Sequence, residues 1–267
     1  MGGVDGSIAL MVTPESAARE LRENRTDGAA VLARRAVSLL SSFVAAADDD
    51  DLRGATRRCA EQMRTARPTM AAVGNLVQSW METFSWPPDD FRHRAMAHCE
   101  SVLGRADRAL AETVRMARDR LEEFPSDSVF LTHSASSTVR SVTDGLPFRL
   151  LATASEPGGE GRRMAAELGV TCVEDDDAPS RVADVAAVVV GADGVGSDAF
   201  VNKVGTRALA HAAWESETPF FVVAESYKWV ASVRPIIAEH SFEAIENELV
   251  TAFLSDRVRC VSLSPRR

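Results

Sequence analysis

The chain has 267 residues, 45% of them hydrophobic, which is enough for one large domain or two ordinary ones with a sizeable core. No stretch approaches the ~20 apolar residues of a membrane span, and the first residues lack a basic-then-apolar signal sequence, so we expect a cytoplasmic protein outside the membrane. The formal net charge of −9 argues against direct nucleic-acid binding.

The cysteines and histidines show no metal-ligand pattern. The four cysteines lie far apart without a CxxC spacing, which in a cytosolic protein favours small buried hydrophobes over ligands or disulfides. His93 and His98 are separated so that a helix would turn them about 140° away from each other. We therefore predict neither a metal nor a cofactor.

The first half of the chain carries helix signals. Residues 1–15 lack periodicity and are predicted to be a loose tail, after which Thr26 or Asp27 caps a helix that the acidic run 48–51 ends. An all-helical domain over residues 1–125 is predicted. Its further helices are expected over 52–67, from Pro68 to residue 84, and over 89–124 with a bend near Gly104.

From residue 126 onward, strand patterns alternate with helix patterns. This alternation predicts an α/β fold over residues 126–267, with a parallel sheet covered by helices on both faces. The spacing of apolar residues in 241–254 predicts an amphipathic helix, and 258–263 reads as a last edge strand. Strands are expected at 128–134, 148–153, 170–173, 185–192 and 219–224, with helices at 160–168 and 207–214.

The valine-rich strand 185–192 ends at a carboxylate, Asp193. Ligands of open α/β sheets bind outside the carboxyl ends of the strands, so Asp193 is a candidate for chemistry. The alternative is an aspartate that only caps the next turn, beside a common glycine-rich connection. Of the 30 basic residues only Lys203 and Lys228 are lysines, and each follows a predicted strand, which favours a ligand site.

A candidate anion site follows this strand. Asn202, Lys203, Gly205 and Thr206 precede the alanine-rich helix 207–214. The free backbone N–H groups of a helix start, together with a lysine, attract an anion. We therefore expect a phosphorylated small molecule as a candidate ligand.

Three blocks of the sequence together resemble one family: VVGAD at 189–193, VNKVGT at 201–206 and PFFVVAESYKW at 219–229. The family joins the alpha, beta and delta subunits of translation initiation factor 2B to ribose-1,5-bisphosphate isomerase and methylthioribose-1-phosphate isomerase. The resemblance covers residues 25–256 and implies a helical amino-terminal domain and a Rossmann-like carboxyl-terminal domain that forms dimers or larger assemblies.

The resemblance also implies catalytic positions. In the isomerases a cysteine follows a Leu-Thr-His block and works with the aspartate of Gly-Ala-Asp. Here the aspartate is Asp193, but Ser134 replaces the cysteine. A thiol ionises near neutral pH in an electropositive site, whereas a hydroxyl needs a neighbouring base. His133 is adjacent, yet neighbouring side chains on a strand point to opposite faces.

Phosphate-binding positions are implied as well. Arg-Pro-Thr and Asn-Lys blocks hold the phosphates in the isomerases, and further family blocks surround them. Carried over by position, the predicted ligand-binding residues are Arg67, Glu160, Asn202, Lys203 and Gly205.

A second departure from the isomerases is Glu156, which stands where they carry an arginine and would repel a phosphate. We therefore expect a non-catalytic, initiation-factor-2B-like regulatory protein, with itself, translation initiation factor 2 and a phosphorylated small molecule as candidate partners. The alternative is a sugar-phosphate aldose–ketose isomerase with Asp193 as acid or base, and a third is another phosphometabolite enzyme on this fold. A subunit interface is expected at five large rings, Trp214, Phe220, Phe221, Trp229 and Phe253.

Overall fold

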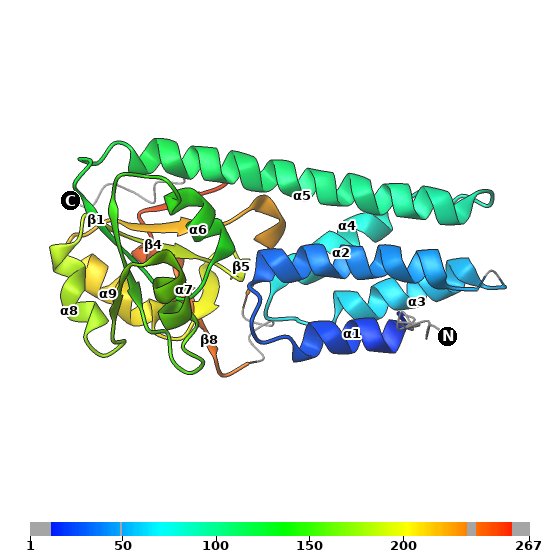
Figure 1. The fold of residues 1–267 in the computed structure, drawn as a ribbon, viewed down its shortest axis with the longest axis horizontal. Coiled ribbons are helices and arrows are strands. Elements are labelled where there is room, and N and C mark those ends of the chain that lie inside the picture. The colour runs from blue at the N-terminus through cyan, green and yellow to red at the C-terminus, as the bar shows by residue number, and fades with distance from the viewer. Residues whose placement is uncertain (1–11, 49, 234–238, 258–267) are drawn as a thin grey trace, which may run out of the picture.

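The computed structural model describes residues 12–48, 50–233 and 239–257, and Figure 1 shows a helical bundle beside an α/β unit. The predicted strand 258–263 lies outside the described residues. The bundle consists of α1 (Pro14–Glu23), α2 (Ala29–Ala46), α3 (Leu52–Arg64), α4 (Ala71–Thr83) and the first part of α5 (Phe91–Leu121).

Helix α2 is the centre of the bundle. Among the described residues it is the one helix long and apolar enough to cross a membrane by length and composition. Its side chains Leu32, Val37 and Leu40 are nevertheless buried in one core with residues of α1, α3, α4 and α5. A helix at the centre of a bundle buries its apolar side chains in this way.

Two predicted boundaries in the bundle are wrong. The loose tail was expected to reach residue 15, but Thr13 caps α1, its Oγ1 accepting a hydrogen bond from the Ser16 amide at 3.1 Å while the Ser16 hydroxyl accepts from the Thr13 amide at 2.8 Å. This reciprocal pair satisfies two N–H groups that a helix start leaves open. Helix α4 begins at Ala71, not at Pro68, and the Ala71 amide donates to the carbonyl of Asp193 at 2.9 Å.

The α/β unit contains a six-stranded parallel sheet in the order β3-β2-β1-β4-β7-β9. The strand order reverses between β1 and β4, which makes their carboxyl ends the topological switch point. The strands are β1 (Val129–Thr132), β2 (Arg149–Thr153), β3 (Thr171–Val173), β4 (Ala187–Gly191), β7 (Phe220–Val223) and β9 (Ala252–Leu254).

Helices cover both faces of this sheet. Ala187 and Val189 of β4 face a core shared with α5 and α6, whereas Val188 and Val190 face a core shared with α8 and α9. Burial on both faces explains why β4 is a run of small and β-branched apolar residues. The helices of the unit are α6 (Ser137–Thr143), α7 (Glu160–Leu168), α8 (Ala178–Arg181) and α9 (Thr206–Glu215).

Residues 241–254 form two strands instead of the expected helix, β9 in the large sheet and one strand of a second, three-stranded sheet. The second sheet pairs β5 (Gly194–Val195), β6 (Ala199–Lys203) and β8 (Phe242–Glu246) in antiparallel register, with Phe200 opposite Ile245. Residues 247–249 then form one 3-10 turn before β9. The predicted amphipathic helix is therefore wrong, and Asn202 and Lys203, which precede α9, lie on β6.

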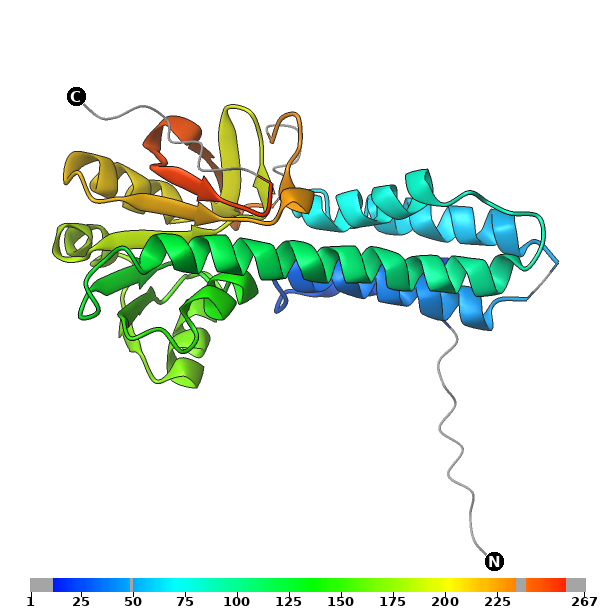
Figure 2. The same cartoon turned by 90° about the horizontal axis from the view of Figure 1, so that it is seen from above.

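Helix α5 runs along both parts of the molecule, as Figure 2 shows from above. Its residues Ala95 and Cys99 are buried in the bundle core, while Ala117 and Leu121 are buried against the sheet. A single 31-residue helix thus fixes the bundle to the sheet. The division of the chain into domains near residue 125 stays a prediction.

The five large rings do not form a common surface. Phe220, Phe221 and Phe253 are buried in the cores around the sheet, and Trp229 is half-buried. Trp214 on α9 is the one ring of the five that is exposed, at 47%. The ring count therefore reflects the size of the cores, and only Trp214 stays available as an interface residue.

Candidate functional site

A cavity of about 600 Å³ lies where the carboxyl edge of the large sheet meets the bundle. It opens at the switch point between β1 and β4, the position at which open α/β sheets bind ligands. Its walls are formed by the start of α2, by Arg67 between α3 and α4, by the turns after β1 and β2, and by the ends of β4 and β6. These walls contribute Arg25, Asp27, Gly28, Ser134, Ser136, Glu160, Asp193, Asn202, Lys203, Lys228 and Glu239, among others.

Asp193 lies at the end of β4 and is held by its backbone. Its amide donates to the carbonyl of Val201 at 2.8 Å, and its carbonyl accepts from the Ala71 amide. Burial raises the pKa of the carboxyl to about 6, against the opposing pull of the Lys228 and Arg67 charges. A carboxyl with this pKa exchanges a proton near neutral pH, as a general acid or base must.

Ser134 lies at the end of β1, on the neighbouring strand. Its backbone has a φ of 67°, in the left-handed region that serine rarely occupies. The Ser155 hydroxyl accepts the Ser134 amide at 2.8 Å, and the Ser134 hydroxyl donates to Glu160 Oε1 at 3.4 Å. The strand-to-helix turn therefore presents the hydroxyl to the cavity wall.

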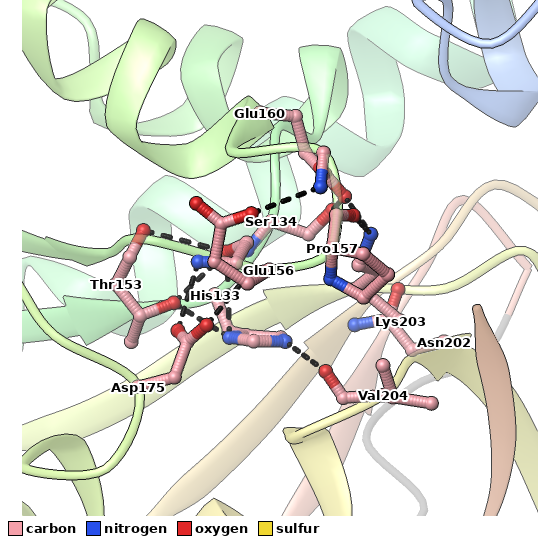
Figure 3. Close-up of polar contacts among 12 residues, drawn as sticks. His133, Ser134, Thr153, Glu156, Pro157, Glu160, Asp175, Asn202, Lys203 and Val204 are labelled. Carbon is pink, nitrogen blue, oxygen red and sulfur yellow. Dashed lines mark hydrogen bonds and ion pairs between the residues drawn. The ribbon is translucent and has the colours of Figure 1, made fainter.

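His133 points away from the cavity. Its Nδ1 contacts the Thr153 hydroxyl at 2.6 Å and its Nε2 contacts the Val204 carbonyl at 2.8 Å, as Figure 3 shows. Burial lowers the pKa of this imidazole, so it is neutral. Both ring nitrogens thus make polar contacts that hold β1 against β2 and against the turn after β6. This geometry agrees with the expectation that His133 is poorly placed to serve Ser134.

Gly205 packs on this histidine and does not line the cavity. A Cβ at Gly205 would lie 2.9 Å from the His133 Cε1, and its φ is 100°. The start of α9 is turned elsewhere too, because the Arg207 amide donates to Glu243 Oε1 at 2.9 Å. The anion site expected from the α9 amides is therefore occupied, in part, by a carboxylate of β8.

Lys203 and Glu160, both labelled in Figure 3, form an ion pair in the lining of the cavity. Lys203 Nζ lies 2.8 Å from Glu160 Oε1 and also donates to the Pro157 carbonyl. Both side chains are largely buried, with 7% and 19% exposed. Asn202 is nearby, and its amide donates to the Thr206 hydroxyl at 3.1 Å.

Arg67 belongs to the bundle but reaches the same cavity. Its Nη1 donates to the carbonyls of Leu21 and Asn24, and its Nε donates to Glu239 Oε1 at 3.1 Å. Arg25 Nη1 contacts the other oxygen of Glu239 at 2.6 Å. One carboxylate is therefore bound between two guanidinium groups.

Lys228 closes the cavity from the 3-10 turn after β7. Its Nζ lies 2.8 Å from Glu225 Oε2, and the Thr138 hydroxyl donates to Glu225 Oε1 at 2.7 Å. Lysine and glutamate are both almost fully buried. Buried charges of this kind need a partner, and here each is the partner of the other.

The start of α2 adds backbone donors. Gly28 caps this helix without a side-chain hydrogen bond, and Gly28, Ala29 and Ala30 line the cavity. The first N–H groups of an α-helix have no acceptor within the helix, and the helix dipole favours an anion there. An 18-residue helix thus points its positive end at the cavity.

The structure brings most of the predicted site residues together. The cavity is lined by Arg67, Ser134, Glu160, Asp193, Asn202 and Lys203, whereas Gly205 lies outside its lining. Glu156 is exposed and also outside the lining, with its carboxylate accepting the Gly158 amide at 3.0 Å. The roles of these residues stay predictions.

Several cavity residues were not predicted as a group. Arg25, the α2 start and Glu239 are distant in sequence from the strand ends and carry no motif that ties them to the sheet. A signal was present for Lys228, since it is one of only two lysines. For Gly28 the signal was weak, because a glycine before a helix is also an ordinary cap.

Fold and cavity together define a class: a helical bundle joined to a Rossmann-like sheet, with a charged cavity at the switch point. The chain matches the Initiation factor 2 subunit family over residues 25–259, and it belongs to that family.

Relatives in this family carry two kinds of name. The chain is 28% identical to a ribose 1,5-bisphosphate isomerase of Archaeoglobus fulgidus, over 80% of this chain and 71% of the relative. It is also 28% identical to a putative translation initiation factor eIF-2B subunit 2-like protein of Pyrococcus horikoshii, over 87% and 83%. Sequence similarity alone therefore does not decide whether this chain is closer in function to the isomerase or to the initiation-factor relatives.

Solved structures agree on the fold. The translation initiation factor eIF-2B of Pyrococcus horikoshii OT3 superposes with a TM-score of 0.80 at 24% identity, covering 94% of this chain and 97% of that one. A 5-methylthioribose 1-phosphate isomerase from the same organism gives 0.72 at 20% identity, covering 92% and 83%. The predicted α/β fold with an amino-terminal helical part is confirmed.

Proposed function

We propose that this protein is a regulatory, non-isomerising member of its family that binds a phosphorylated small molecule in the cavity. The observation that carries this proposal is the hydroxyl of Ser134 beside the Asp193 strand. Its nearest acidic partner, Glu160, is bound to Lys203 at 2.8 Å. The Glu160 oxygen that accepts from Ser134 is thus already in contact with Lys203, and a hydroxyl without a free base is a poor acid–base catalyst.

Binding needs less than catalysis. The α2 amides, Arg25, Arg67 and Lys203 give the cavity both backbone donors and positive charge. Arginine binds a phosphate in a bidentate manner, while lysine acts as a point charge. These fixed donors support an anionic ligand even where the acid–base pair is incomplete.

The carboxylates of the cavity limit how much negative charge it accepts. Glu160, Asp193 and Glu239 all line it, and Glu160 and Glu239 already pair with its cations. Sugar hydroxyls can donate to carboxylates, whereas a second phosphate would meet like charge. We therefore expect weak binding and a preference for one phosphate over two.

The binding test is a thermal melt with a panel of sugar phosphates and nucleoside monophosphates. A ligand at 100 times its dissociation constant stabilises a fold by about 2.7 kcal/mol, which is roughly 5 to 10 °C for a chain of this size. We expect at least one compound to produce such a rise and Lys203→Ala to abolish it. Arg162→Ala is the matched control, because Arg162 pairs with the exposed Glu174 outside the cavity.

The ligand-free melt of Lys203→Ala shows whether that variant folds. If no phosphorylated compound shifts the wild-type melt at millimolar concentration, ligand binding is wrong and the protein acts through its surfaces alone.

A second candidate is a sugar-phosphate isomerase, and a specific observation favours it. The pKa of Asp193 is raised to about 6 by burial, as suits a group that moves a proton in catalysis. The two candidates differ in turnover on ribose 1,5-bisphosphate and methylthioribose 1-phosphate. We expect none with either compound. Turnover on the order of 1 per second or faster, lost in Asp193→Asn, would replace the first candidate with the second.

Partners belong to the same proposal. A relative of this fold is the tetrameric eIF2B-beta2-delta2 complex from C. thermophilum, which matches this chain at 18% identity with a TM-score of 0.66. We infer that the present protein also self-associates, through the α/β unit, in the cytoplasm. Translation initiation factor 2 is the protein partner that its family membership favours.

A further inference from the structure

Glu239 lies between two arginines in the wall of the cavity. Its two oxygens contact Arg67 Nε at 3.1 Å and Arg25 Nη1 at 2.6 Å. The Arg67 side chain is 4% exposed, compared with 23% for Glu239 and 63% for Arg25. A solvent-accessible carboxylate therefore occupies the approach to a buried guanidinium.

Arg67 has backbone partners in addition to Glu239. Its Nη1 donates to the carbonyls of Leu21 and Asn24 at the end of α1, which fix the plane of the guanidinium. The Nε edge, and Nη2 at 3.4 Å, face the carboxylate. An edge of two N–H donors in this arrangement binds a carboxylate or a phosphate in the same way.

A second carboxylate meets a second cation across the cavity. Glu160 contacts Lys203 at 2.8 Å on the strand-end wall, whereas Glu239 contacts Arg67 on the bundle wall. Gly28, Ala29 and Ala30 at the start of α2 line the cavity, and so does the neighbouring Asp27, whose carboxylate accepts from the Asn24 side-chain amide at 2.8 Å. The cavity thus has backbone donors for one anion and internal carboxylates at two other cationic positions.

Resting on the proposed phosphate binding, we propose that Glu239 is a built-in competitor that sets how many phosphate groups the cavity accepts. A monophosphate binds without displacing it. A bisphosphate must either displace Glu239 from Arg25 and Arg67 or bind beside its charge. The selected ligand class is therefore a sugar carrying one phosphate.

The test compares ribose 5-phosphate with ribose 1,5-bisphosphate by titration calorimetry at fixed ionic strength. In Glu239→Gln the shape of the side chain is kept and its charge is removed. We expect this variant to bind the bisphosphate on the order of tenfold or more tightly than wild type does, with a much smaller change for the monophosphate. Glu167→Gln is the matched control, since Glu167 pairs with Arg140 at 2.7 Å outside the cavity, and it should leave both affinities unchanged.

The other outcomes overturn the inference. An unchanged affinity ratio in Glu239→Gln means that Glu239 does not compete, and weaker binding of both compounds means that it only positions Arg67. Should Glu239→Gln melt early, Glu239→Asp keeps the charge and must retain the wild-type preference. If wild type binds the monophosphate through Lys203 and Glu239→Gln has no effect, this inference is wrong but the proposed function still holds. If neither wild type nor Glu239→Gln binds either compound, both this inference and the proposed function are wrong.

Discussion

At the scale of single residues, Asp193 carries a conflict between burial and charge. Its pKa is raised from 3.8 to about 6, because removal from water disfavours the ionised form more than Lys228 and Arg67 favour it. A shift of about two pKa units corresponds to about 3 kcal/mol between the two protonation states. Folding is therefore destabilised whenever this carboxyl has to be ionised.

The sign of the effect follows from proton linkage. The folded pKa lies above the unfolded one, so the folded state holds the proton more tightly between about pH 4 and pH 6. The stabilisation that the protonated Asp193 carboxyl contributes is fully present below about pH 4 and is lost as the pH rises through about 6. We predict that Asp193→Asn is more stable than wild type at pH 7.5, by up to about 3 kcal/mol, and equal to it at pH 4.

Denaturant unfolding at the two pH values measures this difference. Asp184→Asn is the control, because Asp184 is exposed at the end of a 3-10 turn, and it should change stability equally at both pH values. A gain for Asp193→Asn that did not depend on pH would contradict the raised pKa.

At the scale of elements, the turn between β6 and α9 depends on a glycine. Gly205 combines a φ of 100° with a close approach to His133, whose ring a Cβ would meet at 2.9 Å. We predict that Gly205→Ala destabilises the fold by about 2 to 5 kcal/mol, through backbone strain and overpacking together. At 2 to 4 °C per kcal/mol, the melting temperature should fall by roughly 5 °C or more.

Gly145→Ala separates the two causes. Gly145 has a φ of 72° but nothing within 4 Å of the place that an added methyl group would take, so only backbone strain of about 1 kcal/mol is expected there. Equal losses in the two variants would mean that overpacking against His133 adds nothing to the backbone strain.

The elements also show where sequence patterns suffice. Every parallel strand except β9, and also α7, was predictable, because burial on both faces and a 3.6-residue period are local properties of the sequence. Residues 241–254 were not, since Phe242, Ile245 and Leu249 also recur at helical spacing. Pairing of β8 with β6 decides their conformation, and such a tertiary contact overrides the local pattern.

The candidate site likewise contains residues that the sequence predicts and residues that it does not. Asp193 was predictable as a strand-end carboxylate, and Ser134 became visible through the family motif. The competing carboxylate Glu239 was not, because its partners Arg25 and Arg67 come from the other part of the chain. No local pattern marks a glutamate that meets two arginines only after folding.

At the scale of the whole molecule, α5 contributes to both cores, and the cavity between them is lined by both parts. Arg67 and the α2 start belong to the bundle, whereas Asp193 and Lys203 belong to the sheets. The Ala71 amide to Asp193 carbonyl hydrogen bond links the two parts at the cavity itself. Ligand binding should therefore stabilise the interface between bundle and sheet, as well as each part alone.

Assembly is the remaining property of the whole molecule. In the described part of the chain the exposed large hydrophobic side chains are Trp214 on α9, at 47%, and Val31 on α2, at 39%. An exposed tryptophan with a polar surround is a common centre of a protein interface. We predict that the protein is at least a dimer at micromolar concentration, with a mass in light scattering of at least about twice 28.8 kDa.

Substitution locates the interface. If the α/β unit forms it, Trp214→Ser should shift the protein toward monomer, by at least tenfold in the dissociation constant, because loss of a central interface tryptophan typically removes about 2 kcal/mol or more. Val31→Ser is the matched control on the bundle and should leave the mass unchanged. A wild-type mass of 28.8 kDa would contradict self-association, and dissociation by Val31→Ser alone would move the interface to the bundle.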